Sequence, residues 1–405
     1  MHYTRIFNFK YPTILHNPEH NPDQAQYTRE EIALCFTILG MTTPSRSLTL
    51  VVPGLFGPPG LRATDFSMLN CAGLELLLAR ATLELVPAKG LEATLFNLMG
   101  VQGDPAQDLP IAAVTRLADT GVMPDMKHAM MAGEWWIRAD PVHLRADQVQ
   151  LVLMDSYMLS ITREEADVMI AQFNTFFAAD GWYLEALHPE RWYLRLPQDP
   201  GVRTYDVTEV LGRHIDGFLP SGAHGKRWHT VLNEIQMLFH SSPVNQARQM
   251  RGAASINSVW LWGGGYLPQA ISTTAWSAIW SNEPVANGLA RLAGIPHANV
   301  PESLGAWLSA PALPRTRLED AGGAHLVVLD DGYRDALYGD VSAWGAVMER
   351  MATLWFTPLV DALKRRQLDS VSISTADGRI FRITPSLLRR FWKRRHSLEA
   401  YACLK

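Results

Sequence analysis

Cysteine is scarce in this chain of 405 residues, and its three cysteines, Cys35, Cys71 and Cys403, lie far apart. An odd number of cysteines without a CxxC pair favours neither a disulfide framework nor a zinc site, so we expect reduced thiols. Long apolar runs are also missing, since none reaches the roughly 18 residues that cross a bilayer. The first residues, MHYTRIFNFKYP, lack the pattern of a signal peptide. These absences predict a cytoplasmic protein with no membrane partner.

Charged residues make up only 19% of the chain, against 47% hydrophobic residues, which is not the composition of a disordered protein. The length exceeds one ordinary core and predicts two domains, or one large domain with an insertion. The net charge of −4 is unevenly spread, because residues 364–405 carry 11 Lys and Arg against 3 Asp and Glu. This basic end either meets an anionic partner or pairs with acidic surface elsewhere in the chain, and we favour the second interpretation.

Apolar patterns divide the chain into three blocks. The runs SLTLVVP at 47–53 and AHLVVLDD at 324–331 predict buried parallel strands, and we expect both in one sheet. Between them, from about 130 to 265, strand patterns surround one amphipathic helix that begins with a capping box of Thr162 and Glu165. The sequence therefore predicts an α/β core (1–130 and 266–405) that is interrupted by an inserted α+β domain (131–265).

Further segments complete the predicted core. The segment 73–85 is apolar at helical spacing, 282–294 predicts a helix that ends on Gly294, and 340–367 predicts a long amphipathic helix. The segment 369–384 predicts two strands joined by a type I′ turn at Asp377 and Gly378.

The segment LNEIQMLFHSSPVNQARQMRGAASINSVWLWGGG, 232–265, is the most specific motif. It resembles a motif of the archaeal-type cofactor-independent phosphoglycerate mutases, in which a His-Pro-Val-Asn run precedes an Arg, a Gly, an Asn and a glycine-rich turn. The matching residues are His240, Pro243, Val244, Asn245, Arg248, Gly252, Asn257, Gly263 and Gly265. At the level of pattern the likeness runs from about Leu48 to Arg382, and it is nearest to the branch called RpfE-type regulatory proteins in some proteobacteria.

This resemblance implies the fold of the alkaline phosphatase superfamily: a mostly parallel sheet with helices on both faces and a site at the carboxyl ends of its strands. It also implies phosphoryl transfer by a Ser or Thr nucleophile, with two divalent metals held by Asp and His at the strand ends.

The implied metal ligands are incomplete in this sequence. Pro53 stands where the first Asp is expected, no His occurs near Leu337 or Tyr338, and Gly378 replaces the His that follows Asp377. Asp330, Asp331 and Asp377 remain as candidate metal ligands. Because hard divalent ions need several anionic or imidazole ligands at short range, we expect no metal cofactor, with manganese or zinc as the alternative.

The nucleophile candidates are Thr64 and Ser67, but neither has the surroundings that the family predicts. We favour the interpretation that one of them caps the helix that follows. Many relatives also carry an Arg before the glycines of the motif, and here Trp262 takes its place, which cannot bind a phosphate in the same way.

Four motif residues survive as a candidate ligand site: His240, Asn245, Arg248 and Asn257. They would line a pocket for a small anionic ligand, with Arg248 supplying the charge. The equally weighted alternative is that both Asn residues hydrogen-bond loop backbone and Arg248 pairs with a nearby acid.

We therefore expect a catalytically degenerate phosphoglycerate mutase homologue with a regulatory, ligand-sensing or scaffolding role, and a protein partner is one option. The first alternative is an active phosphomutase or phosphoesterase with a non-standard ligand set drawn from Asp65, Asp330, Asp331, Asp335 and Asp340. The second is a protein that binds nucleic acid or an acidic partner through its basic end.

The basic end contains PSLLRRFWKRRH, 385–396, which predicts a helix with Thr384 as N-cap and Pro385 in its first turn. At helical spacing, Leu388, Phe391 and Trp392 would dock on the protein body. The neighbouring side, which would face outward, consists of Arg389, Lys393 and His396.

Overall fold

The computed structural model describes residues 46–87, 90–101, 107–122, 134–147, 150–211, 213–269, 271, 276–311, 313 and 323–403. All described residues belong to one compact unit, Ser45–Lys405. Cys35 and the predicted domain boundary at 130 lie outside the described residues. None of the described helices is long and apolar enough to cross a membrane.

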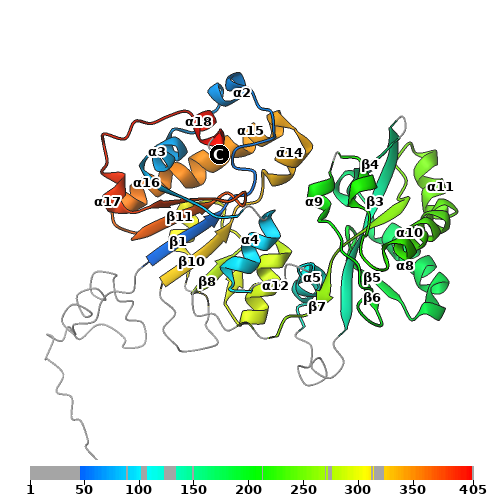
Figure 1. Ribbon diagram of the computed structural model, residues 1–405. Helices are drawn as coiled ribbons and strands as arrows, with labels where there is room; N and C mark the ends of the chain where they lie inside the picture. The colour runs from blue at the N-terminus through cyan, green and yellow to red at the C-terminus, as the bar shows by residue number, and fades with distance from the viewer. Residues whose placement is uncertain are drawn as a thin grey trace, which may run out of the picture. The chain divides into compact units, whose positions relative to one another are not determined.

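A seven-stranded sheet with the order β2-β12-β11-β1-β10-β8-β9 forms the centre of the α/β part (Figure 1). Its parallel strands are β1 (Arg46–Val51), β8 (Ala278–Trp280), β9 (His297–Ala298), β10 (Gly323–Val328) and β11 (Ser370–Ser374). Two antiparallel strands, β12 (Arg379–Ile383) and β2 (Thr82–Leu85), extend one edge. Since β1 pairs with β10, the prediction that the two apolar runs lie in one sheet is confirmed.

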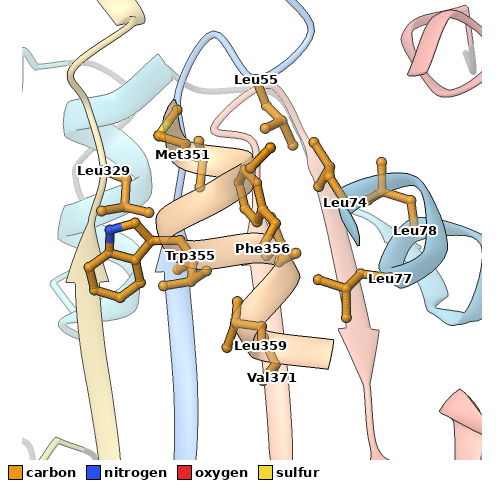
Figure 2. Close-up of a cluster of buried hydrophobic side chains, with 14 of the residues drawn as sticks. Leu55, Leu74, Leu77, Leu78, Leu329, Met351, Trp355, Phe356, Leu359 and Val371 are labelled. Atoms are coloured by element: carbon orange, nitrogen blue, oxygen red, sulfur yellow. The ribbon is translucent and has the colours of Figure 1, made fainter. Parts of the chain in front are cut away.

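Helices cover both faces of this sheet, which explains why its central strands are apolar throughout. Successive side chains point to opposite faces, so Leu50 packs into one buried cluster and Val51 into the other. The first face is covered by α3 (Ala72–Arg80), α15 (Val341–Met351) and α16 (Thr357–Lys364), and Figure 2 shows part of this cluster. The second face is covered by α4 (Gly90–Leu98), α5 (Ile111–Thr120) and α12 (Pro284–Ala293). The predicted mixed α/β fold with a mostly parallel sheet is confirmed.

A second sheet is built from residues 135–266, with the order β4-β3-β6-β5 and β7 paired to β3. Its strands are β3 (Trp135–Asp147), β4 (Gln150–Met154), β5 (Tyr183–His188), β6 (Arg191–Leu196) and β7 (Ser258–Tyr266). Apolar side chains of α8 (Arg163–Phe176) and α10 (Gly225–His240) pack on it. The helix α8 begins with the predicted capping box, because Glu165 N–H donates to Thr162 Oγ1 and Thr162 N–H donates to Glu165 Oε2. The division into domains remains a prediction.

Short helices connect these elements, and α11 follows α10 directly. Their bounds are α2 (Ala63–Ser67), α7 (Ser156–Leu159), η2 (Ala178–Asp180), α9 (Val207–Val210), η3 (Ile215–Phe218), α11 (Pro243–Met250), α13 (Leu304–Ser309), α14 (Tyr333–Tyr338), α17 (Pro385–Leu388) and α18 (Leu398–Ala402).

Three predicted elements differ from the observed ones in the core. The apolar segment 73–85 is helical only as α3, and its last residues form β2, because an edge of the sheet is available to pair with them. The long helix is divided by one turn of π-helix, η4 (Ala352–Phe356), just before Pro358, which has no N–H for a helical hydrogen bond. The hairpin of β11 and β12 is present, but positive φ falls on Ala376 and Gly378 and not on Asp377, so the turn is not type I′.

The predicted helix at the basic end is the largest error. Thr384 does cap α17, accepting a hydrogen bond from Leu387 N–H at 3.3 Å, but this helix ends at Leu388. Phe391 is 82% exposed and Trp392 is 65% exposed, so these two rings do not dock on the protein body. The residues after Leu388 form successive turns, and they do not share the helical faces that the spacing predicts.

Candidate functional site

A cleft of about 870 Å³ opens at the carboxyl ends of β1 and β11. Its walls are the loop 53–61 after β1, the turn 375–377 after β11, and Tyr333 at the start of α14. The second sheet contributes residues 206–213 around α9 to the same lining. A cleft in this position is where an open, mostly parallel sheet carries its ligand site, so we treat it as the candidate site.

The loop after β1 presents backbone and apolar groups to the cleft and no carboxylate. Pro53 is buried, and the chain then turns at Gly54, whose carbonyl accepts hydrogen bonds from Gly57 N–H at 2.9 Å and from Trp344 Nε1 at 3.0 Å. Gly57 has φ +75° and lies so close to Trp344 that a Cβ would be 2.8 Å from the indole ring. The loop is therefore packed tightly against α15, with a proline at the position of the first expected metal ligand.

Four carboxyl groups from four separate elements interact electrostatically, Glu92 with Asp206 and Glu283, and Glu283 with Asp330; of these, Glu92 and Asp206 line the cleft. Burial and the neighbouring Asp206 hold the pKa of Glu92 well above its usual range, and burial also raises the pKa of Asp206. Burial, with Asp330 nearby, raises the pKa of Glu283 to about 7. Burial and Asp331 raise the pKa of Asp330 to about 6. The pKa of each group is raised mainly because burial disfavours the charged carboxylate.

Local capping explains why two of these acids are buried. Asp206 is the N-cap of α9 and accepts hydrogen bonds from Thr208 N–H at 2.8 Å and Thr208 Oγ1 at 2.9 Å. Glu283 is the N-cap of α12 and accepts a hydrogen bond from Ala286 N–H at 2.8 Å. Neither acid was identified from the sequence, although an acid directly before Val207 or Pro284 is a recognisable helix start.

The predicted metal ligands do not converge on one point. Asp330 faces the buried carboxyl groups, whereas Asp331 pairs with Arg350 at 2.8 Å on the surface, where both side chains are 55% exposed. Asp377 binds its neighbour Arg379 with an Nε to Oδ2 distance of 3.1 Å. Within the described residues, no group of three or more His, Cys, Asp or Glu side chains is placed to hold a metal ion. The residues present therefore do not fit the two-metal centre that the resemblance implies.

The acids proposed as substitute ligands have local structural contacts. Asp65 accepts a hydrogen bond from Arg62 N–H at 2.8 Å at the start of α2, and Asp340 accepts one from Ala343 N–H at 2.9 Å at the start of α15. Asp335 lies within α14, where burial raises its pKa.

Thr64 and Ser67, the candidate nucleophiles, both lie within α2 and are exposed. Ser67 Oγ donates a hydrogen bond to the Thr64 carbonyl at 2.8 Å. The prediction that one of them caps the following helix is wrong, because the N-cap of α3 is Cys71. In the described lining of the cleft, α2 is represented by Phe66, and neither Thr64 nor Ser67 belongs to that lining.

The two motif asparagines bond to loop backbone. Asn245 donates hydrogen bonds to the Phe239 and Ile256 carbonyls, both at 2.8 Å, and accepts one from Ile256 N–H at 2.7 Å. Asn257 bonds both backbone groups of Leu144, at 2.7 Å to its N–H and at 3.0 Å to its carbonyl. These contacts join the loop 250–257 to α10 and to β3, which is the structural role that the sequence analysis left open.

Arg248 is buried, with 1% of its side chain exposed. Its guanidinium donates to Glu165 Oε2 at 2.5 Å, to the Ala254 carbonyl at 2.7 Å and to the Leu159 carbonyl. His240, the last residue of α10, is exposed. The structure thus brings Asn245 and Arg248 together around one loop but does not bring either of them to the lining of the cleft. A ligand-binding role for these residues remains a prediction.

A second buried arginine, Arg138 on β3, was not identified from the sequence. Its guanidinium binds the Asp140 carboxylate at 2.7 to 3.0 Å, and both side chains are almost fully buried. Trp262 stands where many relatives have an Arg. Its Nε1 donates a hydrogen bond to Asp140 Oδ2 at 2.8 Å, and its ring centroid lies 5.1 Å from Arg138 Cζ. The Arg138 charge is therefore neutralised inside the second sheet.

Carboxyl groups outnumber guanidinium groups in the described lining of the cleft. The acids are Glu92, Asp206, Glu209, Asp377 and Glu399, and the bases are Arg213 and Arg379. Arg379 is already engaged, since it pairs with Asp377, donates to the Tyr401 carbonyl at 2.7 Å and lies 4.1 Å from the Phe56 ring. Because Asp377 already pairs with Arg379, the described lining offers an entering anion little positive charge beyond Arg213.

Comparison with known proteins gives a partial match. No family model matches the chain. Over 61 residues it is 33% identical to the 2,3-bisphosphoglycerate-independent phosphoglycerate mutase of Methanosarcina mazei and 31% identical to that of Methanosarcina acetivorans. Each match covers 15% of this chain, and the chain spans only about 15% of the length of these curated relatives.

Two solved structures are similar over most of the chain at low sequence identity. The PH0037 protein from Pyrococcus horikoshii aligns with a TM-score of 0.49 and 12% identity, covering 85% of this chain and 88% of that one. The cofactor-independent phosphoglycerate mutase from Thermoplasma acidophilum aligns with a TM-score of 0.43 and 15% identity, covering 90% and 96%. The expected resemblance to the archaeal cofactor-independent phosphoglycerate mutases is confirmed, as a similarity that is low and partial in sequence.

Proposed function

We propose that this chain, a homologue of the archaeal cofactor-independent phosphoglycerate mutases, is catalytically degenerate and acts by binding, in a regulatory, ligand-sensing or scaffolding role. The observation that carries the proposal is the state of the strand ends around the cleft. Pro53 follows β1, Gly378 follows Asp377 in the turn after β11, and Asp331 after β10 points away to Arg350.

The chemical reason lies in what phosphoryl transfer with two metals requires. The metals lower the pKa of the nucleophile and stabilise the charge on the attacking and leaving oxygens, so several ligands must meet at one place. Here the surviving acids diverge, and Thr64 and Ser67 lie outside the described lining of the cleft.

Electrostatics supports the same proposal. Phosphoglycerate carries a carboxylate and a phosphate, and the cleft lining has an excess of acids with Arg379 already paired. Arg248 in the motif and Arg138, which lies beside Trp262 of the motif, are neutralised by Glu165 and Asp140. The proposal places the protein in a cytoplasm, where the free thiols of Cys71 and Cys403 would stay reduced.

The test is metal analysis combined with a mutase assay on full-length protein from cells supplied with manganese and zinc. We expect less than a tenth of an equivalent of either metal per chain, and no interconversion of 2- and 3-phosphoglycerate above a blank. Two tightly bound metals per chain, with turnover that is lost in Asp331→Ala and kept in the matched surface variant Asp361→Ala, would show that the proposal is wrong.

A further inference from the structure

The segment 389–397, between α17 and α18, is named the basic–aromatic loop here. It is held at both ends, because Leu388 packs against the buried core cluster before it, and Leu398 and Tyr401 are buried after it. Inside the loop, Phe391 N–H donates to the Arg389 carbonyl at 2.7 Å, and the Lys393 amide also closes a backbone turn. The loop is therefore a fixed protrusion from the core and not a free end.

Two adjacent aromatic rings project from this loop into solvent. Phe391 is 82% exposed and Trp392 is 65% exposed, with ring centroids 5.3 Å apart and ring planes at 82°. Burying one such ring is favourable by about 1.5–3 kcal/mol, so two exposed neighbours are unusual unless another molecule covers them. Because the planes are nearly perpendicular, each ring keeps a face that is accessible to a flat partner.

Five cations flank the rings: Arg389, Arg390, Lys393, Arg394 and Arg395. No acid occurs between Pro385 and Leu398, and Arg395 is the only one of the five with an ion pair to a described residue, Glu75 at 3.4 Å. Elsewhere in the basic end, Lys364, Arg379 and Arg382 also pair with acids, whereas within the loop only Arg395 has an ion pair to a described acid. The remaining four cations are available to an anion.

A second group of cations lies next to the loop. The helix α16 ends at Lys364 and is followed by Arg365 and Arg366; all three residues are exposed, and α16 contacts α17. Of these, Lys364 pairs with Asp361 at 3.3 Å. Figure 1 shows α17 beside the end of α16 on the first face of the sheet. The loop is thus preceded by a helix that contacts α16, on a chain whose net charge is −4.

We propose that the basic–aromatic loop binds single-stranded nucleic acid. Phosphates would pair with Arg389, Arg390, Lys393 and Arg394, and unpaired bases would stack on Phe391 and Trp392. This combination of stacking rings and flanking cations binds single strands with little sequence preference. A base-paired duplex hides its ring faces and would use the cations alone. This surface lies outside the described lining of the cleft, so a negative binding result would leave the proposed loss of catalysis unaffected.

The loop fits an anionic membrane less well. Peripheral membrane segments are amphipathic helices with a broad apolar face, whereas the helical part here is the four-residue α17. The apolar content of the exposed loop is limited to two adjacent rings, and this pair lies between Arg390 and Lys393 in the sequence.

The experiment measures fluorescence anisotropy of a labelled 12-nucleotide oligouridine, titrated with full-length protein from about 50 to 300 mM salt. Four phosphate contacts on a single strand predict that log K falls with log salt with a slope of about −3. The variant F391A/W392A should bind roughly ten-fold or more weakly with an unchanged slope, because stacking is lost and the charges stay. The variant with all four free cations changed to Gln should bind weakly with a slope near zero.

The matched control is F176A, which removes a half-exposed phenylalanine on α8, and it should bind as the native chain does. A duplex of the same length should bind more weakly than the single strand and should be insensitive to F391A/W392A. Circular dichroism of each variant checks the fold. Absence of binding, equal binding of F391A/W392A and native protein, or capture by phosphatidylserine vesicles with no effect of the oligonucleotide would overturn the proposal.

Discussion

Replacing Arg248 distinguishes the two roles that the sequence left open for the motif. Arg248→Met keeps most of the apolar stem and removes three interactions, with Glu165 at 2.5 Å, with the Ala254 carbonyl at 2.7 Å and with the Leu159 carbonyl. Breaking a buried ion pair from one side costs about 3–5 kcal/mol, because the other charge stays buried without its partner. Glu165 keeps Arg251 and the Thr162 amide, which lowers the penalty. We therefore expect the free energy of unfolding to fall by about 3 kcal/mol.

The assay is urea unfolding followed by tryptophan fluorescence and circular dichroism, with Arg248→Lys as the matched variant. Lys keeps the charge but not the planar fork, so it should lose about half as much stability. The double variant with Glu165→Gln should lose less than the sum of the single losses, because both remove the same pair. A loss below about 1 kcal/mol for Arg248→Met would refute the structural role and would favour the ligand-binding hypothesis for this residue.

Two further predictions concern the helix α12. Burial raises the pKa of Glu283 to about 7, so the folded state holds a proton that the unfolded chain releases, and stability should decrease as pH rises from about 4.5 to 7. Glu283→Gln keeps the cap oxygen and should remove about 3 kcal/mol of this pH dependence, leaving a decrease of the same sign from Asp330, Glu92 and Asp206. Equal melting-temperature changes between pH 5 and pH 8 in both proteins would refute this. Gly288→Ala should destabilise the fold by about 3 kcal/mol or more in urea unfolding, since a Cβ would lie 2.1 Å from the Val114 carbonyl oxygen on α5. The control Gly305→Ala meets nothing closer than 3.7 Å and should change stability by less than about 1 kcal/mol, and a similar effect of the two would contradict the packing argument.

The parts of the fold that could be predicted are those in which local pattern and tertiary surroundings agree. The apolar run of β1 is buried on both faces, and the capping box of Thr162 starts α8 where the sequence places it. Residues 82–85 depart from their helical pattern because β12 offers them backbone partners that no local signal reports, so they form the edge strand β2. Similarly, the spacing of Phe391 and Trp392 predicts a shared helical face, but the helix ends before either of them.

The candidate site was less predictable than the fold. The family resemblance directs attention to the ends of β1, β10 and β11, and the cleft is found beside two of these ends. The buried acids Glu92, Asp206 and Glu283 belong to three elements that only the folded topology brings together. No spacing within a single segment of sequence could reveal such a group, because its members lie far apart in the sequence and meet only in the folded chain.

The central position of β1 has a consequence for how the protein is made. Arg46 of β1 pairs with Gly323 of β10, and the opposite edge of β1 pairs with β11, so both neighbours are synthesised about 280 or more residues later. At about 5–20 residues per second, β1 waits roughly 15–55 s on the ribosome for its first partner. The second sheet, made from residues 135–266, is complete well before that moment. During this interval the apolar strand β1 has no strand to pair with and is prone to aggregation. Expression conditions that slow aggregation, such as low temperature or extra chaperone, should therefore raise the yield of folded protein.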